Sequence, residues 1–249
     1  MNFEDNEKDE LIFGIRAVME AINAGKEIDR VLIKKGLEGE LYKEFFDLVR
    51  SRNVSFQFVP VEKLNRVTRK NHQGVVAFIS PISFYKIEDL LPVWFEEGKS
   101  PVVLVLDQIS DVRNFGAIVR TAECAGVSAV IIPEQGAAKI NADAVKTSAG
   151  ALHLVPVCRV KNIVDACMYL QHSGLKIIAA TEKSNELYTS ADYSGPLAIV
   201  MGSEDKGIDR RILSLADHRV KIPILGKIES LNVSVAAALL VYEVVRQRS

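Results

Sequence analysis

An asparagine and an arginine, spaced as they would be on one helix, are the first residues of the chain that could do chemistry. They lie in the segment Asn114–Thr121, after an apolar run, and Arg120 follows Asn114 by six residues, nearly two helical turns. Asn114 is a good N-cap residue, and an arginine beside a ligand loop can hold a phosphate. Taken alone, the segment is more simply interpreted as a capped helix with a surface arginine.

Two later segments add polar side chains beside glycines and apolar runs. Glu204 lies between Gly202 and Gly207, immediately after an apolar run. A carboxylate between two glycines at the end of a strand could belong to a ligand-binding loop, although a solvated acidic turn is the alternative. Ser230 and Asn232 precede a long apolar helix, where a side-chain oxygen can cap free backbone N–H groups. Simple helix capping is the first interpretation of this third segment.

Composition indicates an ordinary soluble globular protein. The 249 residues are 48% hydrophobic and 25% charged, enough for one large or two small domains. The formal net charge of −1 does not indicate a nucleic-acid-binding protein. For such binding, however, local basic clusters matter more than the total charge. The cysteines Cys124, Cys158 and Cys167 have no Cys-x-x-Cys spacing, which fits a reducing compartment and argues against zinc. With no secretory leader or membrane span, we expect a cytoplasmic protein without a metal.

The usual nucleotide-binding motifs are missing from the sequence. No Gly-x-Gly-x-x-Gly pattern occurs, which disfavours a Rossmann oxidoreductase. Gly226 and Lys227 are followed by Ile228 where a P-loop needs Ser or Thr. A ligand site in this chain must therefore be built in another way.

The first part of the chain alternates helices and strands. After an acidic and polar tail at 1–10, which we expect to be disordered, the pattern predicts helices at 14–23, 37–52 and 61–68 and strands at 30–33, 54–59 and 74–79. These elements predict a small α/β domain over residues 11–80. Residues 81–100, with Pro81 and Pro92, are expected to be a linker with one amphipathic turn around 90–95.

From residue 101 the character of the sequence changes. Apolar runs at 102–106, 129–132, 177–180 and 197–201 lack polar alternation, as strands of a parallel sheet covered on both faces do. Helical stretches between them, at 115–124, 142–148, 162–172 and 210–216, predict a doubly wound sheet over 101–249. Ligands of such sheets lie beyond the carboxyl ends of the strands, so the loops there should carry the chemistry.

The segment that ends the chain contains eight consecutive apolar residues, Val235–Tyr242. A helix that is apolar all round is buried on more than one side. We therefore expect it to lie inside its own domain or against a second subunit.

Taken together and in order, the three polar segments resemble the three motifs of the SpoU (TrmH-like) family of RNA ribose 2′-O-methyltransferases in the SPOUT superfamily. Asn114 and Arg120 match the first motif, 201–207 with its glutamate matches the second, and 222–236 with Ser-Leu-Asn matches the third. The resemblance covers about residues 100–249. Asp205 is a departure, because many members have glycine there.

The preceding domain is similar to the L30e-type substrate-binding domain of two-domain members of this family. The similarity lies in Phe13-Gly14 near its start and in 71–74, Asn-His-Gln-Gly, near its end. The 23S rRNA guanosine 2′-O-methyltransferase type is the closest match. The resemblance thus implies an α/β protein with a small L30e-like N-terminal domain and a SPOUT-type parallel-sheet domain that ends in a C-terminal trefoil knot.

The resemblance also implies a reaction, a cofactor and a set of site residues. It implies methyl transfer from S-adenosyl-L-methionine to an RNA ribose, by a homodimer that uses the last helix. The implied catalytic set is Asn114, Arg120, Glu204, Ser230 and Asn232, and the implied cofactor contacts are Thr181, Gly202, Ile222 and Leu231.

The reaction needs a ribose hydroxyl in line with a sulfonium methyl, so positioning supplies much of the rate acceleration. The hydroxyl must also lose its proton. Arginine is essentially always protonated, so we expect Arg120 to clamp the phosphate and orient the hydroxyl, with proton removal as a second possibility. Glu204 is the competing base, or it holds Asn232 and the loop.

RNA could be gripped by a basic group before the last strand of the first domain, formed by Arg66, Arg69, Lys70 and His72. A solvated charged face is the alternative. We expect a 23S rRNA guanosine as the target, with tRNA as the second possibility. A catalytically silent RNA-binding or ribosome-assembly protein is the alternative from a different functional class.

Overall fold

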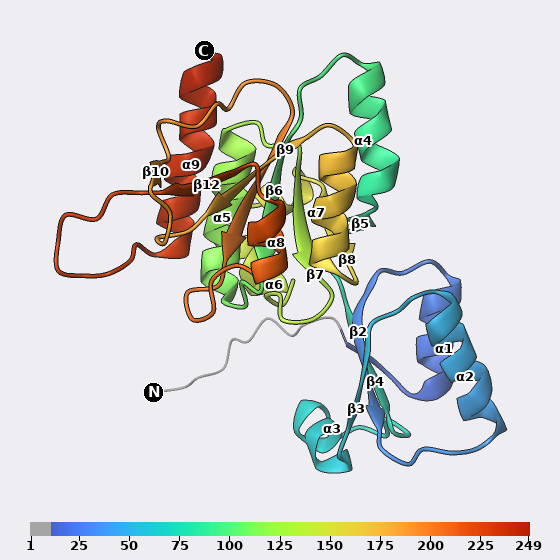
Figure 1. Cartoon of the computed structure of the whole chain (residues 1–249). Coiled ribbons are helices and arrows are strands. Elements are labelled where there is room, and N and C mark those ends of the chain that lie inside the picture. The colour runs from blue at the N-terminus through green and yellow to red at the C-terminus, as the bar shows by residue number, and fades with distance from the viewer. Residues whose placement is uncertain (1–10) are drawn as a thin grey trace. The chain divides into compact units, whose positions relative to one another are not determined.

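The structure is a computed structural model that describes residues 11–249; the predicted tail at 1–10 lies outside the described residues. The chain divides into two units (Figure 1). The first runs to Ser83 and includes Ile140–Ala142, and the second comprises Phe84–Lys139 and Asp143–Ser249. Each unit has its own sheet.

The sheet of the first unit has four strands in the order β1-β4-β2-β3. Strand β4 pairs antiparallel with β1 and β2, and β2 pairs parallel with β3. Two helices pack on one face and a third on the other (Figure 1). The elements are β1 (Leu11–Phe13), α1 (Ile15–Asn23), β2 (Ile28–Lys34), α2 (Glu40–Ser51), β3 (Phe56–Val59), α3 (Val61–Val67) and β4 (Val75–Ile79).

Alternation along the strands of the first unit explains its two small cores. Val31 and Ile33 of β2 face α1 and α2, where they pack with Phe45 and Val49. Leu32, between them, faces the other way and packs under α3. The predicted helices and strands of this region are confirmed in type, with ends that shift by a few residues, and only the short strand β1 was missed.

The second unit holds an eight-stranded sheet in the order β10-β12-β9-β11-β6-β7-β8-β5, in which all neighbours run parallel. The predicted parallel sheet is confirmed. Strand β6 is buried along its whole length, and β11 is buried except at its last residue. The strands are β5 (Phe84–Tyr85), β6 (Val102–Asp107), β7 (Ala129–Pro133), β8 (Val157–Val160), β9 (Lys176–Ala180), β10 (Glu186–Leu187), β11 (Leu197–Gly202) and β12 (His218–Lys221).

Helices cover both faces of this sheet (Figure 1). On one face α4, α7 and α8 pack with Val103 and Val105 of β6. Leu104 and Leu106 point to the opposite face and are equally buried; on that face α5 packs against α9. The helices are α4 (Ile87–Glu96), α5 (Val112–Cys124), α6 (Ala142–Thr147), α7 (Ile163–His172), α8 (Arg210–Leu215) and α9 (Val233–Arg248), with a 3₁₀ turn at Ala151–His153.

The stretch predicted to be a linker, 81–100, is structured instead. It contributes β5, which pairs with β8, and the helix α4 in place of one amphipathic turn. Pro92 lies inside α4, although proline usually breaks a helix interior. Ile87 and Leu91 are fully buried in the core of the second unit, so packing outweighs the local signal of the proline.

The order of the strands reverses at β6. The chain leaves β6 through α5 toward β7 and β8 on one side, and it returns through α7 to β9 and β11 on the other. The carboxyl ends of β6 and β11 are adjacent, with Asp107 paired to Gly202. Such a reversal of strand order is where ligands bind in open parallel sheets.

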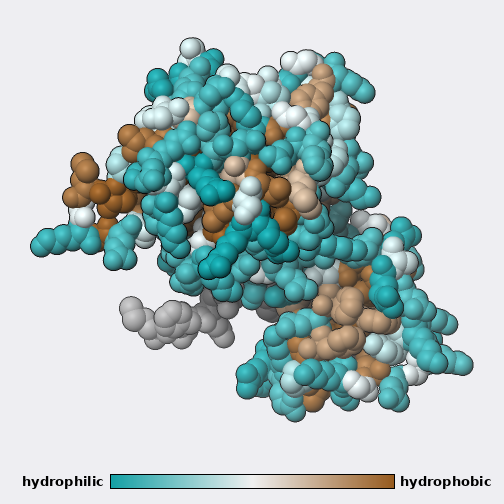
Figure 2. Space-filling view, in the orientation of Figure 1, coloured by the Kyte–Doolittle hydropathy of each residue, from teal (hydrophilic) through white to brown (hydrophobic). Residues whose placement is uncertain are grey.

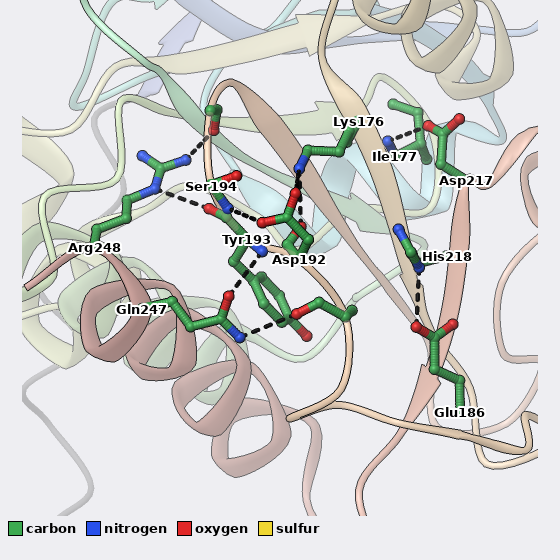
Figure 3. A network of polar contacts seen from close by, with 12 residues as sticks. Lys176, Ile177, Glu186, Asp192, Tyr193, Ser194, Asp217, His218, Gln247 and Arg248 are labelled. Atoms are coloured by element: carbon green, nitrogen blue, oxygen red, sulfur yellow. Dashed lines mark hydrogen bonds and ion pairs between the residues drawn. The ribbon is translucent and has the colours of Figure 1, made fainter.

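Helix α9 is fixed at its carboxyl end by a polar network (Figure 3). The Gln247 side chain accepts a hydrogen bond from the backbone N–H of Tyr193 at 3.0 Å and donates one to the carbonyl of Ala191 at 3.0 Å. The Arg248 guanidinium donates to the carbonyls of Tyr193 at 3.0 Å and Ser100 at 2.9 Å. These bonds tie the helix to the segments before β6 and β11.

The apolar run in α9 is buried on one side only. Ala237, Leu240 and Val241 are buried against the second unit, whereas Val235, Leu239 and Tyr242 are 48%, 37% and 50% exposed. The first alternative, complete burial within its own domain, is therefore wrong for the single chain. The trefoil knot and the L30e-type assignment stay predictions.

Residues 11–249 contain neither a membrane-spanning helix nor a cluster of metal ligands. No helix in this range is long and apolar enough to cross a membrane. No group of three or more His, Cys, Asp or Glu side chains in the same range could hold a metal ion.

Candidate active site

Helix α5 begins earlier than the sequence suggests, and this changes the role of Asn114. The N-cap is Asp111, whose side chain accepts a hydrogen bond from the backbone N–H of Asn114 at 2.8 Å. The prediction that Asn114 caps the helix is wrong, because an aspartate three residues earlier takes that position. The Asn114 side chain, in the first turn, is thereby left to bond elsewhere.

Asn114, Glu204 and Asn232 converge from three segments that are far apart in the sequence. The Asn232 Nδ2 donates to Asn114 Oδ1 at 2.9 Å and lies 3.3 Å from Glu204 Oε1. The Asn114 Nδ2 lies 3.4 Å from the same carboxylate oxygen. The three side chains predicted to act together therefore form one hydrogen-bonded cluster beyond the carboxyl ends of β6 and β11.

Asn232 serves two purposes through the two ends of its amide. Its Oδ1 accepts hydrogen bonds from the backbone N–H of Ser234 at 2.9 Å and from the Ser234 hydroxyl at 2.6 Å, so it caps α9 as predicted. Because the oxygen is used by the cap, the amide NH₂ group must face away from the helix. The start of α9 thus aims a pair of N–H donors at Asn114 and Glu204.

The Glu204 carboxylate is held by several donors at one oxygen. Its Oε1 accepts from the backbone N–H of Val233 at 3.2 Å as well as from the two asparagine amides. A negative charge beside the first turn of α9 also interacts favourably with the helix dipole. This geometry favours a positioning role for Glu204 over proton removal.

Glu204 is carried by a tight turn that requires glycine at its start. Ser203 and Gly207 form an isolated β-bridge, and the Gly207 N–H donates to the Ser203 carbonyl at 2.8 Å. A Cβ atom on Gly202 would lie 2.2 Å from the carbonyl carbon of Gly207. Gly202 is therefore needed for the close approach of backbone to backbone that shapes the loop.

The predicted cofactor-binding residues lie along the same edge of the sheet. Thr181, Gly202 and Ile222 stand at or just after the carboxyl ends of β9, β11 and β12, which are neighbouring strands. Leu231 directly precedes Asn232 and is 37% exposed. The structure thus gathers three of the four residues at adjacent strand ends and places the fourth beside the cluster in sequence.

Arg120 and Ser230 do not belong to the hydrogen-bonded cluster. Arg120 is exposed on α5, six residues and about 9 Å of helix beyond Asn114. Ser230 is exposed in the loop before α9. Within residues 11–249 neither side chain makes a hydrogen bond or an ion pair, so both are free to meet a ligand.

Asp107 is a site residue that the sequence analysis missed. It ends β6 beside Gly202, is 2% exposed, and its Oδ2 accepts the backbone N–H of Asp209 at 2.8 Å. Burial raises the pKa of this carboxyl above its ordinary value, although the hydrogen bond from Asp209 lowers it. The signal was a carboxylate that ends an otherwise apolar strand. Through its hydrogen bond with Asp209, Asp107 fixes the segment that follows the loop carrying Glu204.

The predicted RNA-binding residues divide into two groups. Arg66, Arg69 and Lys70 are exposed, as a surface that meets RNA must be. His72 is only 9% exposed: its Nδ1 accepts the backbone N–H of Gly74 at 3.0 Å, and its Nε2 lies 2.9 Å from the side-chain oxygen of Asn65. The His72 ring therefore holds the turn before β4 instead of facing a ligand.

Two models of known protein families match the chain. The model of the SpoU rRNA Methylase family matches residues 101–242, and the model named RNA 2′-O ribose methyltransferase substrate binding matches residues 11–85. Two curated relatives carry the name TrmH family tRNA/rRNA methyltransferase. The one from Bacillus subtilis is 31% identical over 98% of each chain, and the one from Staphylococcus aureus is 37% identical over 97% of each chain.

A solved structure shares the fold. The SpoU methyltransferase AviRb from Streptomyces viridochromogenes, in complex with the cofactor AdoMet, superposes with a TM-score of 0.61 at 24% identity, covering 97% of this chain and 91% of that one. The first family model spans more than half of the chain, and the curated relatives match nearly all of it. The chain therefore belongs to the SpoU (TrmH) family of RNA methyltransferases.

Proposed function

We propose that this protein transfers the methyl group of S-adenosyl-L-methionine to the ribose 2′-hydroxyl of a guanosine in 23S rRNA, in the cytoplasm. The convergence of Asn114, Glu204 and Asn232 at the strand-order reversal supports the proposal. The family assignment supports RNA methylation in general. The ribose hydroxyl and the 23S rRNA guanosine rest on the resemblance of the motifs and of the first domain.

The residues at the edge of the sheet fit the proposed cofactor. The loop before α9 exposes large apolar side chains, among them Leu225 at 97% and Ile228 at 78%. Brown atoms project at the left of Figure 2, where Figure 1 shows this loop. An adenosine moiety needs apolar surface together with backbone donors and acceptors. S-adenosyl-L-methionine would be held by Thr181, Gly202, Ile222 and Leu231. When bound, this cofactor supplies an electrophilic methyl group on its sulfonium. The proposal includes the trefoil knot of the family.

The chain's own residues would orient the ribose and manage its proton. Arg120, exposed and without a side-chain partner among residues 11–249, would clamp the phosphate next to the target ribose and orient the 2′-hydroxyl. The hydroxyl oxygen would bond to the methyl carbon while the methyl–sulfur bond breaks and leaves a neutral thioether, and the hydroxyl proton would pass to the phosphate that Arg120 holds or to solvent. Ser230 and the amides of Asn114 and Asn232 would position these groups, while Glu204 keeps the amides in place.

Arg120→Ala tests the assignment of roles. We expect methyl transfer to be abolished while the dissociation constant for S-adenosyl-L-methionine, measured by calorimetry, stays nearly unchanged. A variant that kept most of its rate would remove Arg120 from the catalytic set. A wild-type protein that did not bind the cofactor would instead indicate a silent RNA-binding protein.

A tRNA substrate is the second candidate, because the curated relatives are named for both tRNA and rRNA. The two are separated by mapping 2′-O-methyl groups in the rRNA and tRNA of a deletion strain. We expect the deletion strain to lack one 2′-O-methylguanosine in 23S rRNA. Loss of a 2′-O-methyl group from tRNA would show instead that tRNA is the substrate.

We further propose that residues 11–80 bind RNA and that residues 101–249 carry out the transfer as a homodimer. Val235, Leu239 and Tyr242 form an exposed apolar stripe at i, i+4 and i+7 of α9, the spacing with which one helix face meets another. Sedimentation velocity should give a dimer for the wild type and a monomer for Val235→Asp/Leu239→Asp. A monomeric wild type would remove the dimer from the proposal.

A further inference from the structure

An aromatic cluster reaches the surface of the first unit. It lies on the face opposite the basic residues that are predicted to bind RNA. Phe56 and Phe58 of β3 pack against Phe46 of α2, with ring centroids 5.1 Å and 5.8 Å from its ring, and Tyr42 stacks on Phe46 at 5.7 Å. Arg66, Arg69 and Lys70 lie on or just after α3, which packs on the other side of the sheet. We call Tyr42, Phe46, Phe56 and Phe58 the aromatic platform.

The platform is unusual in its exposure. Phe56 and Phe58 are 38% and 42% exposed, and they are the only large hydrophobic side chains that the described part of the first unit exposes to this degree. They alternate along β3 and so share one face of it. Strand β3 is an edge strand, since it pairs only with β2 within residues 11–249. Apolar atoms of this unit are visible at the surface in Figure 2.

Two cations border the platform on α2. Lys43 and Arg50 are exposed and stand three residues before and four residues after Phe46, so they are its neighbours on the helix surface. The acidic residues Glu44 and Asp47 lie further round the helix from Phe46. Rings flanked by positive charge suit a ligand that is both flat and anionic.

We propose that the aromatic platform binds unpaired nucleobases of the RNA substrate by stacking, with Lys43 and Arg50 contacting the adjoining phosphates. Bases splayed from single-stranded loops stack on aromatic side chains in many RNA-binding proteins. A protein partner is disfavoured by size, because a stable interface buries about 800 Å² on each side and two half-exposed rings offer far less. The ligand class rests on the proposed function.

Replacement of the rings by aliphatic side chains, which keeps the surface apolar, tests the proposal. Phe56→Leu/Phe58→Leu in the full chain should raise the dissociation constant for a single-stranded RNA of about 12 nucleotides by about tenfold or more. The constant for a duplex of the same length should not change. The slope of affinity against salt should also stay the same, because phosphate contacts are kept. Phe95→Leu on α4 is the matched control, since Phe95 is 37% exposed and lies in the second unit.

Other outcomes overturn the proposal in recognisable ways. An unchanged dissociation constant for the single strand would exclude stacking, as would an equal loss on the duplex. A change in sedimentation instead of in RNA affinity would make the platform a protein interface. If the wild-type protein methylated no RNA while Phe56→Leu/Phe58→Leu still weakened single-strand binding, the proposed function would be refuted and the aromatic platform would remain an RNA-binding site.

Discussion

The side-chain amide of Asn232 donates a hydrogen bond to the side-chain oxygen of Asn114 at 2.9 Å across 118 positions of sequence. This bond links the start of α9 to the first turn of α5, two helices that also pack against each other. It shows that the cap of one helix and the polar cluster of the site share a single side chain.

Asn232→Ser should separate these two tasks. Serine caps a helix about as well as asparagine, so the free energy of unfolding should change by less than about 0.5 kcal/mol. Serine has no NH₂ group to reach Asn114 and Glu204, so methyl transfer should fall by about tenfold or more. Urea titration and a tritiated-methyl assay measure the two effects. Full activity in this variant would show that the amide bonds are not needed.

Glu204→Gln distinguishes a positioning carboxylate from a base. The glutamine oxygen can still accept the hydrogen bonds that Oε1 receives, so we expect activity within about tenfold of wild type. Loss of a general base typically costs about 10²–10⁴ in rate. Glu204→Ala, which removes the acceptor, should be worse than Glu204→Gln. Equal and complete inactivity of both variants would return Glu204 to the role of base.

Gly202→Ala should disrupt the loop that carries Glu204. Its new Cβ would lie 2.2 Å from the carbonyl carbon of Gly207, and overpacking of this kind costs about 1–3 kcal/mol or more. Thermal unfolding and cofactor affinity should both suffer. Gly226→Ala is the control for stability, because a Cβ there meets nothing within 4 Å. Comparable melting temperatures for the two variants would contradict the close approach.

Asp107→Asn should make stability less sensitive to pH. Burial raises the folded-state pKa of Asp107, so its charged form costs stability above that pKa, and the cost disappears as the pH falls toward 3.8. Asparagine keeps an oxygen for the N–H of Asp209 without the charge. The variant should therefore be more stable than wild type at neutral pH, with an advantage that shrinks under acid. Trp94, the single tryptophan, packs on this core and reports the unfolding.

Arg248→Ala should weaken the anchor at the far end of α9. The guanidinium donates to carbonyls of Tyr193, Gly195 and Ser100, and because it is partly solvated we expect a loss of about 1–2 kcal/mol in unfolding free energy. Lys99→Ala removes an exposed ion pair with Glu97 and should cost less than about 0.5 kcal/mol. Denaturation followed through Trp94 compares them. Equal losses would mean that the anchor adds nothing beyond a surface contact.

Much of the fold followed from patterns that report burial. Runs such as 197–201 predicted parallel strands, because a strand covered on both faces has no need of polar alternation. The convergence of the polar segments followed from the same inference, since the carboxyl ends of neighbouring parallel strands lie at one edge. The cap at Asn232 was predictable from residue type alone.

Other features depend on choices that the local sequence leaves open. Asp111 and Asn114 are both good caps three residues apart, and only packing decides that the helix starts at the first. Pro92 suggested a break, yet α4 is kept whole by its buried face. His72 is a basic residue type, but its side chain is buried and accepts the backbone N–H of Gly74. The local sequence does not reveal this burial.

The dependence of the polar cluster on α9 has a consequence for biosynthesis. Asn114 and Glu204 leave the ribosome before Asn232, so a nascent chain that has already formed β6 and β11 still lacks the amide that joins them. The carboxylate would then face water without two of its three donors. The hydrogen-bonded cluster therefore cannot form in parts during synthesis. It is complete only when α9 has been made and has packed against α5.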